Sequence, residues 1–305
     1  MKRLLLTLIL AISLARATTA SAGTFTMHEG IEYASPNGHA LLLDLRVPDG
    51  PGPHPVILYL HSGAWITGDR TGGPAIRQAK RGYAVASAEY RLAPQHIWPA
   101  QVEDAKAAIR WLRAHASRFN LDPNRIGVFG ASAGGHIASV LGTSGGVASL
   151  EGLGHGNPQF SSRVKVVVDL FGPTDLLKIE EQKLPCIPLD GNSPNMPPSL
   201  LMGCPIQQCK EKTATANPIT YVTKDDPPFL IMHGLLDCLV PWKQSAILHE
   251  ALEAANVDSR LILIPNGDHG GRAFDSDKYE QAVDDFLDTH LRGPVTVKAK
   301  RRAVR

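Results

Sequence analysis

Residues 125–138 constrain the fold of this chain more than any other stretch. Their sequence, RIGVFGASAGGHIA, passes from a strand-like run through a tight turn into helix-compatible sequence. Ser132 stands in the turn, with Gly130 and Gly134 two positions to either side. Glycines there let the strand and the helix approach each other closely. The pattern predicts that the Ser132 hydroxyl is lifted clear of the backbone, beside the amide of Ala133 at a helix N-terminus, where negative charge is favoured.

Strand-like and helix-like segments alternate along most of the chain. An opening antiparallel hairpin is expected from residues 24–33 and 41–47. Amphipathic helices are expected at 99–115, 241–255 and 275–291. The other strands have the apolar character of strands buried on both faces, and are expected at 55–60, 83–88, 126–129, 164–170, 229–233 and 260–264. This alternation predicts an α/β fold with a mainly parallel central sheet and helices on both faces.

No internal repeat or interdomain linker divides the 305 residues, so a single domain is expected over residues 23–294. One segment, about 180–217, breaks the alternation with prolines, three cysteines and no clear periodicity. An insertion of this length inside a compact domain is usually a lid or a binding loop. The alternative is a surface excursion without a role.

The two ends of the chain are expected to lie outside this domain. Residues 1–22 have the pattern of a signal peptide, because two basic residues precede an apolar run and Ala20-Ser21-Ala22 is a cleavage pattern. The run is too short to span a membrane, and no second run of spanning length follows. Export to the periplasm or the outside is therefore expected. Residues 295–305 form a basic tail, expected to be disordered, and the net charge of +2 indicates no nucleic-acid partner.

Export changes the expectation for the four cysteines. In an oxidising compartment an even number favours disulfides, but four cysteines allow three pairings, and the sequence does not choose between them. Our hypothesis is Cys204 with Cys209 and Cys186 with Cys238, which ties the irregular segment to the loop that carries Asp237. The alternative is free buried thiols.

A serine hydroxyl is a weak nucleophile until a base removes its proton, and a carboxylate fixes the tautomer of that base. Asp237 follows the strand expected at 229–233, and His269 follows the strand expected at 260–264. Both therefore stand on loops after later strands, where a Ser-Asp-His triad needs them. The order Ser132, Asp237, His269 is the one found in the α/β-hydrolase fold.

Other histidines and acids compete for these roles. His61 and His233 also end strands, but His61 precedes the serine and His233 lies beside the acid's loop. Asp169 and Asp175 lie at or after the preceding strand and compete with Asp237, although Asp175 has the setting of a turn or a helix cap. Core or surface roles suit the histidines expected on helices, which are His115, His136 and His249.

The loop after the strand at 55–60 has the sequence His61-Ser62-Gly63-Ala64-Trp65. Its small central residues let a backbone press against a substrate, so the amides of Gly63 and Ala64 are expected to join that of Ala133 in holding an oxyanion. An ordinary glycine turn is the alternative. Trp65 is expected either to line a substrate pocket or to pack in the core.

The sequence lacks the motifs of several other chemistries. It has no P-loop lysine pattern and no G-x-G-x-x-G in a dinucleotide context. Cys204 and Cys209 have no partners at zinc-finger spacing. No cofactor and no metal are therefore expected.

Taken together, these motifs resemble those of the α/β-hydrolase esterases of the acetyl esterase and hormone-sensitive-lipase type, in particular the carbohydrate and feruloyl esterase branch. The resemblance covers most of the chain from residue 23 onward. It rests on HSGAW at 61–65 with GD at 68–69, YRL at 90–92, GASAGG at 130–135, Asp237 before VP at 240–241, and HGG at 269–271. Two features depart from the family: Ser62 replaces the second residue of its usual His-Gly-Gly, and the cysteine-bearing segment is unusual.

The resemblance implies a serine esterase that acts through an acyl-enzyme on carboxylic esters of short-chain or carbohydrate- or aryl-linked acyl groups. The implied partner is a small-molecule or carbohydrate ester. Two alternatives remain: an arylformamidase that cleaves an amide with the same triad, and a binding protein of this fold without catalysis.

Overall fold

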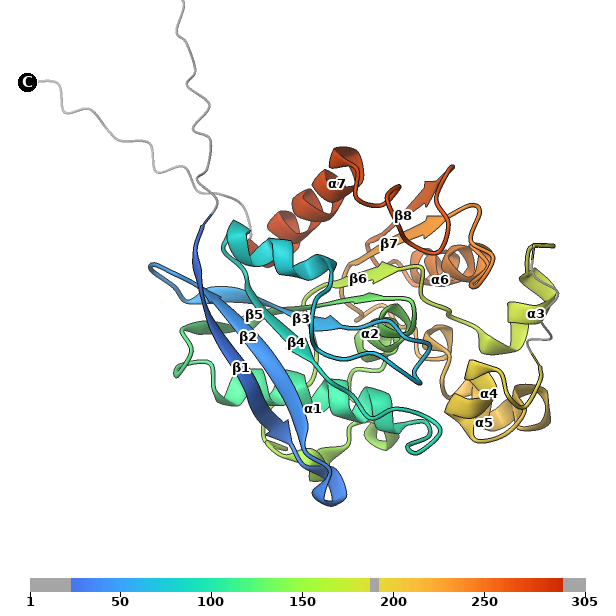
Figure 1. Cartoon of the computed structure of the whole chain (residues 1–305), viewed down its shortest axis with the longest axis horizontal. Helices are drawn as coiled ribbons and strands as arrows, with labels where there is room; N and C mark the ends of the chain where they lie inside the picture. The colour runs from blue at the N-terminus through green and yellow to red at the C-terminus, as the bar shows by residue number, and fades with distance from the viewer. Residues whose placement is uncertain (1–22, 187–191, 293–305) are drawn as a thin grey trace, which may run out of the picture.

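The computed structural model describes residues 23–186 and 192–292. The expected signal peptide and basic tail therefore lie outside the described residues. An eight-stranded sheet has the order β1-β2-β4-β3-β5-β6-β7-β8 (Figure 1). Its strands are β1 (Phe25–Ala34), β2 (Leu41–Pro48), β3 (His54–Leu60), β4 (Ala84–Ala88), β5 (Leu121–Ala131), β6 (Val167–Leu170), β7 (Phe229–Gly234) and β8 (Ser259–Ile264).

The sheet is mainly parallel, as the alternation predicts. All neighbours from β4 to β8 pair in parallel, whereas β1 with β2 and β2 with β4 pair antiparallel. The carboxyl ends of β3, β5, β7 and β8 consequently lie at one edge of the sheet. This edge is where the candidate nucleophile, acid and base follow their strands.

Helices cover both faces of the sheet, because the strands alternate apolar side chains toward two cores. In β3, Val56, Leu58 and Leu60 pack into one core with α1 (Ala100–Ala114), α2 (Ala133–Thr143) and α6 (Lys243–Ala254). Ile57 and Tyr59 pack into the other core, with the 3₁₀ segment η2 (Pro74–Arg81) and α7 (Asp277–Leu287). The predicted fold class is confirmed. Within the two described ranges, no helix is both long enough and apolar enough to cross a bilayer.

The segment at about 180–217 interrupts the strand and helix alternation, as expected, but it includes short helices that the sequence pattern does not indicate. The segment contains α3 (Ile179–Gln182), α4 (Pro197–Met202) and α5 (Lys210–Ala214). Each has only a turn or slightly more of helix, which is too short to produce a helical periodicity in the sequence. The 3₁₀ segment η2, which covers one face of the sheet, was also not predicted.

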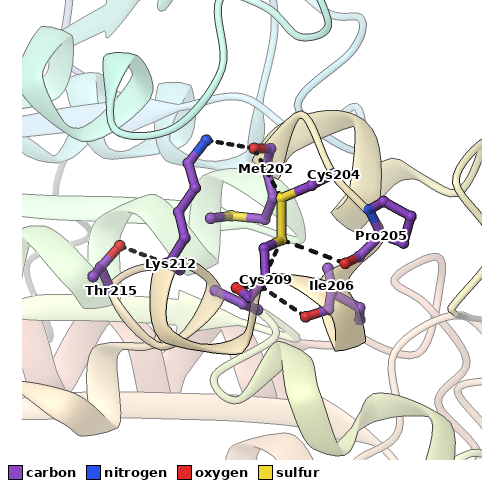
Figure 2. Close-up of a disulfide and its surroundings, with 8 residues drawn as sticks. Met202, Cys204, Pro205, Ile206, Cys209, Lys212 and Thr215 are labelled. Atoms are coloured by element: carbon purple, nitrogen blue, oxygen red, sulfur yellow. Dashed lines mark hydrogen bonds between the residues drawn. A yellow bond between two sulfur atoms is a disulfide. The ribbon is translucent and has the colours of Figure 1, made fainter.

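The structure contains both disulfides of the hypothesis, and none of the described cysteines is free. Cys186 and Cys238 are separated by 52 positions in the sequence, and Cys204 and Cys209 by 5. Figure 2 shows the short one, which joins the end of α4 to the start of α5. Beside it, the Lys212 ammonium donates to the Met202 carbonyl at 2.5 Å. The short disulfide therefore closes a local turn, whereas the long one ties the insertion to the acid's loop.

We predict that the two disulfides differ in their contribution to stability. The loop-closure entropy of the unfolded chain implies a loss of about 4 kcal/mol for the Cys186→Ser/Cys238→Ser variant and about 2 kcal/mol for Cys204→Ser/Cys209→Ser. Urea denaturation of both double variants and the unaltered chain measures the two losses, and thiol titration of the unfolded, unreduced chain should find no free thiol. An equal loss in the two variants would contradict the prediction.

Candidate active site

Ser132 lies in the turn between β5 and α2, in a backbone conformation that residues other than glycine rarely adopt (φ 55°, ψ −120°). Two backbone hydrogen bonds hold it there. Its amide donates to the Leu170 carbonyl at 2.8 Å, and its carbonyl accepts from the His136 amide at 2.9 Å. The side chain therefore projects away from both elements, as the sequence pattern predicts.

The glycines on either side of the turn have no space for a side chain. A Cβ added to Gly134 would lie 2.1 Å from the Leu60 carbonyl oxygen, and one added to Gly130 would lie 2.1 Å from the Gly134 carbonyl oxygen. Real Cβ atoms essentially never come within 3.0 Å of a heavy atom of a residue that is not their neighbour in the chain. The first turn of α2 can therefore contact the end of β3 only because both residues are glycine.

The structure brings Ser132, His269 and Asp237 into one hydrogen-bonded chain. His269 Nε2 lies 2.8 Å from Ser132 Oγ, and His269 Nδ1 lies 2.7 Å from Asp237 Oδ2. Because an ionised carboxylate can only accept, Nδ1 carries the proton and Nε2 presents a lone pair to the serine hydroxyl. This is the tautomer in which the imidazole can remove the serine proton.

Asp237 is fully buried and accepts four hydrogen bonds. Oδ2 accepts from His269 and, at 3.1 Å, from His233 Nε2, while Oδ1 accepts from the amides of Leu239 and Val240, both at 2.9 Å. Burial by itself would raise the pKa of the Asp237 carboxyl, but the hydrogen bonds from His233 and His269 outweigh it and lower that pKa to about 2. The group is therefore a carboxylate at any pH at which a histidine can serve as a base.

The competing acids and histidines have other partners. Asp169 is buried beside α2 and accepts from Ser139 Oγ at 2.7 Å. Asp175 caps η5 (Leu176–Lys178) by accepting from the Leu177 amide, which confirms the predicted cap. His61 is stacked on Tyr90 with ring centroids 4.1 Å apart.

The loop at 61–65 lies beside Ser132. Gly63, Ala64 and Trp65 all have positive φ, at 124°, 52° and 63°. For Ala64 and Trp65, a positive φ costs roughly 1–2 kcal/mol of conformational free energy each. Other contacts must therefore hold the loop in place. One of them is the hydrogen bond from Ser62 Oγ to the Ala131 carbonyl at 2.9 Å. Ser62, the departure from the family pattern, thus joins this loop to the residue before Ser132.

Trp65 fits both interpretations of the sequence. Its side chain is buried in the core and its Nε1 donates to His136 Nδ1 at 3.1 Å. It also contributes to the wall of a cavity next to Ser132.

Two cavities meet at the serine. The larger has a volume of about 700 Å³ and extends under η2 and α7; the smaller, about 190 Å³, extends toward the insertion. The residues common to both walls are Ala64, Ser132, Leu239 and His269. A carbonyl carbon at Ser132 would therefore have one cavity for each of its two substituents.

Sequence reasoning missed the roles of two histidines. His233 was considered only as a rival base, yet it donates to the carboxylate of Asp237. His136 is buried, as a core role requires, but its hydrogen bond with Trp65 in the loop at 61–65 was not predicted. The spacing of His233 and Asp237, four residues apart across a strand end, is the only signal that the sequence offered. Within the described residues, no cluster of three or more histidine, cysteine or acidic side chains is arranged to hold a metal ion.

Comparison with known proteins agrees with this architecture. A truncated form of a carbohydrate esterase from gut microbiota is 30% identical, with a TM-score of 0.78 over 90% of this chain and 99% of that one. A bifunctional GH43-CE protein from Bacteroides eggerthii is 35% identical, with a TM-score of 0.75 over 85% of this chain and 37% of that one. Esterase LipC of Mycobacterium tuberculosis is 34% identical over 245 residues, or 76% of this chain.

The fold and the geometry at the sheet edge define an α/β-hydrolase. The BD-FAE family model matches residues 43–252, and the chain belongs to that family. It spans 57% of the length of LipC, and 50% and 60% of two further curated relatives.

We predict that Gly134→Ala destabilises the fold strongly. The added methyl group would overlap the Leu60 carbonyl oxygen, so the free energy of unfolding should fall by about 3 kcal/mol, or the chain should not fold. Gly154→Ala is the matched control, because a Cβ there meets nothing within 4 Å, and it should change stability by less than about 0.5 kcal/mol. Denaturant unfolding compares the two variants; equal stabilities would refute the close approach.

Proposed function

We propose that this chain is a serine esterase that hydrolyses carboxylic esters, with Ser132 as nucleophile, His269 as general base and Asp237 as the acid that orients it. The observation that carries the proposal is the hydrogen-bonded chain from Asp237 through His269 to Ser132, at the point where two cavities meet. The similarity to proteins named as esterases, such as LipC and the gut carbohydrate esterase, also supports ester hydrolysis.

The reaction proceeds in two halves. His269 Nε2 takes the Ser132 proton as Oγ attacks the ester carbonyl carbon, and the amides of Gly63, Ala64 and Ala133 hold the oxyanion. His269 then returns the proton to the departing alkoxide, so the carbon–oxygen bond breaks and an acyl-enzyme remains. Water attacks the acyl-enzyme with His269 again as base, which releases the acid and restores the serine.

The two cavities suit an ester with one short and one larger substituent. The smaller cavity has room for a group of a few carbons, and the larger one has room for a sugar or an aromatic ring. Apolar side chains line most of the inner part of the larger cavity, including Phe129, Leu170, Phe171, Met232, Phe274 and Val283. Short-chain esters and carbohydrate- or aryl-linked acyl groups are the substrates that we infer.

We also infer that the protein is exported. The basic, apolar and small-residue pattern of residues 1–22 supports this, and so do the two disulfides, which persist in oxidising compartments.

We predict that Ser132→Ala abolishes hydrolysis of p-nitrophenyl acetate while the chain stays folded. The variant lacks the only atom that forms the acyl-enzyme, and the smaller side chain fits the same turn. Initial rates and circular dichroism test this, and a fluorophosphonate should label the unaltered chain but not the variant. Near-normal turnover by Ser132→Ala would show that the nucleophile is elsewhere.

We predict that Asp237→Asn lowers kcat about a thousandfold or more, because an amide favours the wrong tautomer of His269. Asp175→Asn is the matched control: its carboxylate caps η5 and contacts neither His269 nor Ser132, so kcat should stay within about threefold. Steady-state kinetics on p-nitrophenyl acetate compares the two variants. A larger loss of kcat in Asp175→Asn would show that the acid that orients His269 follows β6 rather than β7.

A further inference from the structure

His136 joins three parts of the chain that surround the proposed oxyanion hole. It stands one helical turn after Ser132, and its ring is completely buried. Nδ1 lies 3.1 Å from Trp65 Nε1, in the loop that carries Gly63 and Ala64. Nε2 lies 2.7 Å from the carbonyl oxygen of Ala216, at the end of the insertion.

The two partners determine the tautomer of this ring. An indole nitrogen can only donate and a carbonyl oxygen can only accept. Nδ1 must therefore be the unprotonated acceptor for Trp65, and Nε2 must carry the proton that goes to Ala216. Burial lowers the pKa of His136 to about 4, so the acceptor for Trp65 persists at the pH at which an esterase works.

Trp65 needs such an anchor because its backbone conformation is unfavourable. It follows Ala64, and both residues have positive φ. The Trp65 carbonyl accepts from the Ala93 amide at 2.9 Å, and its side chain is held by His136. The amide of His136 donates in turn to the Ser132 carbonyl at 2.9 Å. A single residue thus holds both the nucleophile's turn and the side chain next to Ala64.

We propose that His136 is a positioning residue that, through its hydrogen bond with Trp65, sets the Ala64 amide at the correct distance from the Ala133 amide for the oxyanion. The inference rests on the esterase reaction proposed above. His136 does not touch the substrate; it acts on the loop whose backbone does.

The test is Trp65→Phe, which keeps a buried aromatic ring but removes the donor to His136. Loss of oxyanion alignment should lower kcat for p-nitrophenyl acetate about tenfold and leave KM within about twofold. The affinity of a trifluoromethyl ketone, which forms a tetrahedral adduct with the serine, should fall by the same factor as kcat/KM. A purely structural role for the hydrogen bond would change the melting temperature but not the affinity of the folded enzyme for this probe.

Trp98→Phe is the matched control. The Trp98 ring also lies near His136, with centroids 5.6 Å apart, and its Nε1 donates to Thr215 Oγ1 at 3.0 Å. The Trp98→Phe variant therefore loses an indole hydrogen bond that is partly buried and whose acceptor lies outside the loop at 61–65, so its kcat and probe affinity should stay within about twofold of those of the unaltered chain. The double variant Trp65→Phe/His136→Gln should have nearly the same kcat as Trp65→Phe, because the hydrogen bond between the two residues is already lost in the single variant.

Equal kcat losses in Trp65→Phe and Trp98→Phe, or unchanged probe affinity in Trp65→Phe, would overturn the positioning role. These results differ from a failure of the esterase proposal itself. That failure would appear as no ester hydrolysis by the unaltered chain, or as hydrolysis that survives Ser132→Ala.

Discussion

The close approach of α2 to the ends of β3 and β5 is the constraint on which the site depends. The first turn of the helix contacts the Leu60 carbonyl directly, and this contact exists only because Gly134 has no side chain. In the same turn Ser132 has its unusual backbone conformation, and its hydroxyl lies 2.8 Å from His269 Nε2 on the loop after β8. The approach also places Ala133 in the wall of the smaller cavity beside Ser132.

The sequence was sufficient to predict how the triad residues come together. Ser132, Asp237 and His269 each follow an apolar strand, and an alternating strand and helix pattern makes those strands parallel, so their ends share one edge. The roles of His233 and His136 could not be predicted in this way. A histidine on a strand or a helix is defined by what faces it, and Trp65 and Ala216 reach His136 only in the folded chain. The short helices of the insertion were hidden for a different reason, since four to six residues cannot display a helical period.

Burying a carboxylate is unfavourable in free energy unless hydrogen-bond donors surround it. The loop after β7 supplies such donors to Asp237. The amides of Leu239 and Val240 turn toward Oδ1 of Asp237, and His233 completes the set at Oδ2. The Val240 carbonyl also accepts from His233 Nε2 at 2.9 Å, so that nitrogen must carry a proton. His269 is consequently not the only donor that stabilises the Asp237 carboxylate, and its Nδ1 proton is directed at an oxygen whose position other donors already fix.

The walls of the two cavities come from different parts of the chain. The larger cavity lies between the sheet, η2 and α7, all of which belong to the central α/β architecture. The smaller one is closed by Glu180 and by the start of α4, which belong to the insertion, and by Cys238 beside Asp237. The disulfide from Cys186 to Cys238 joins the insertion to the loop that carries Asp237. A shift of the insertion would therefore displace Cys238, the residue next to Asp237. The shape of the smaller cavity and the position of Asp237 are therefore coupled through this disulfide, whereas the part of the larger cavity under η2 and α7 has no such link to the insertion.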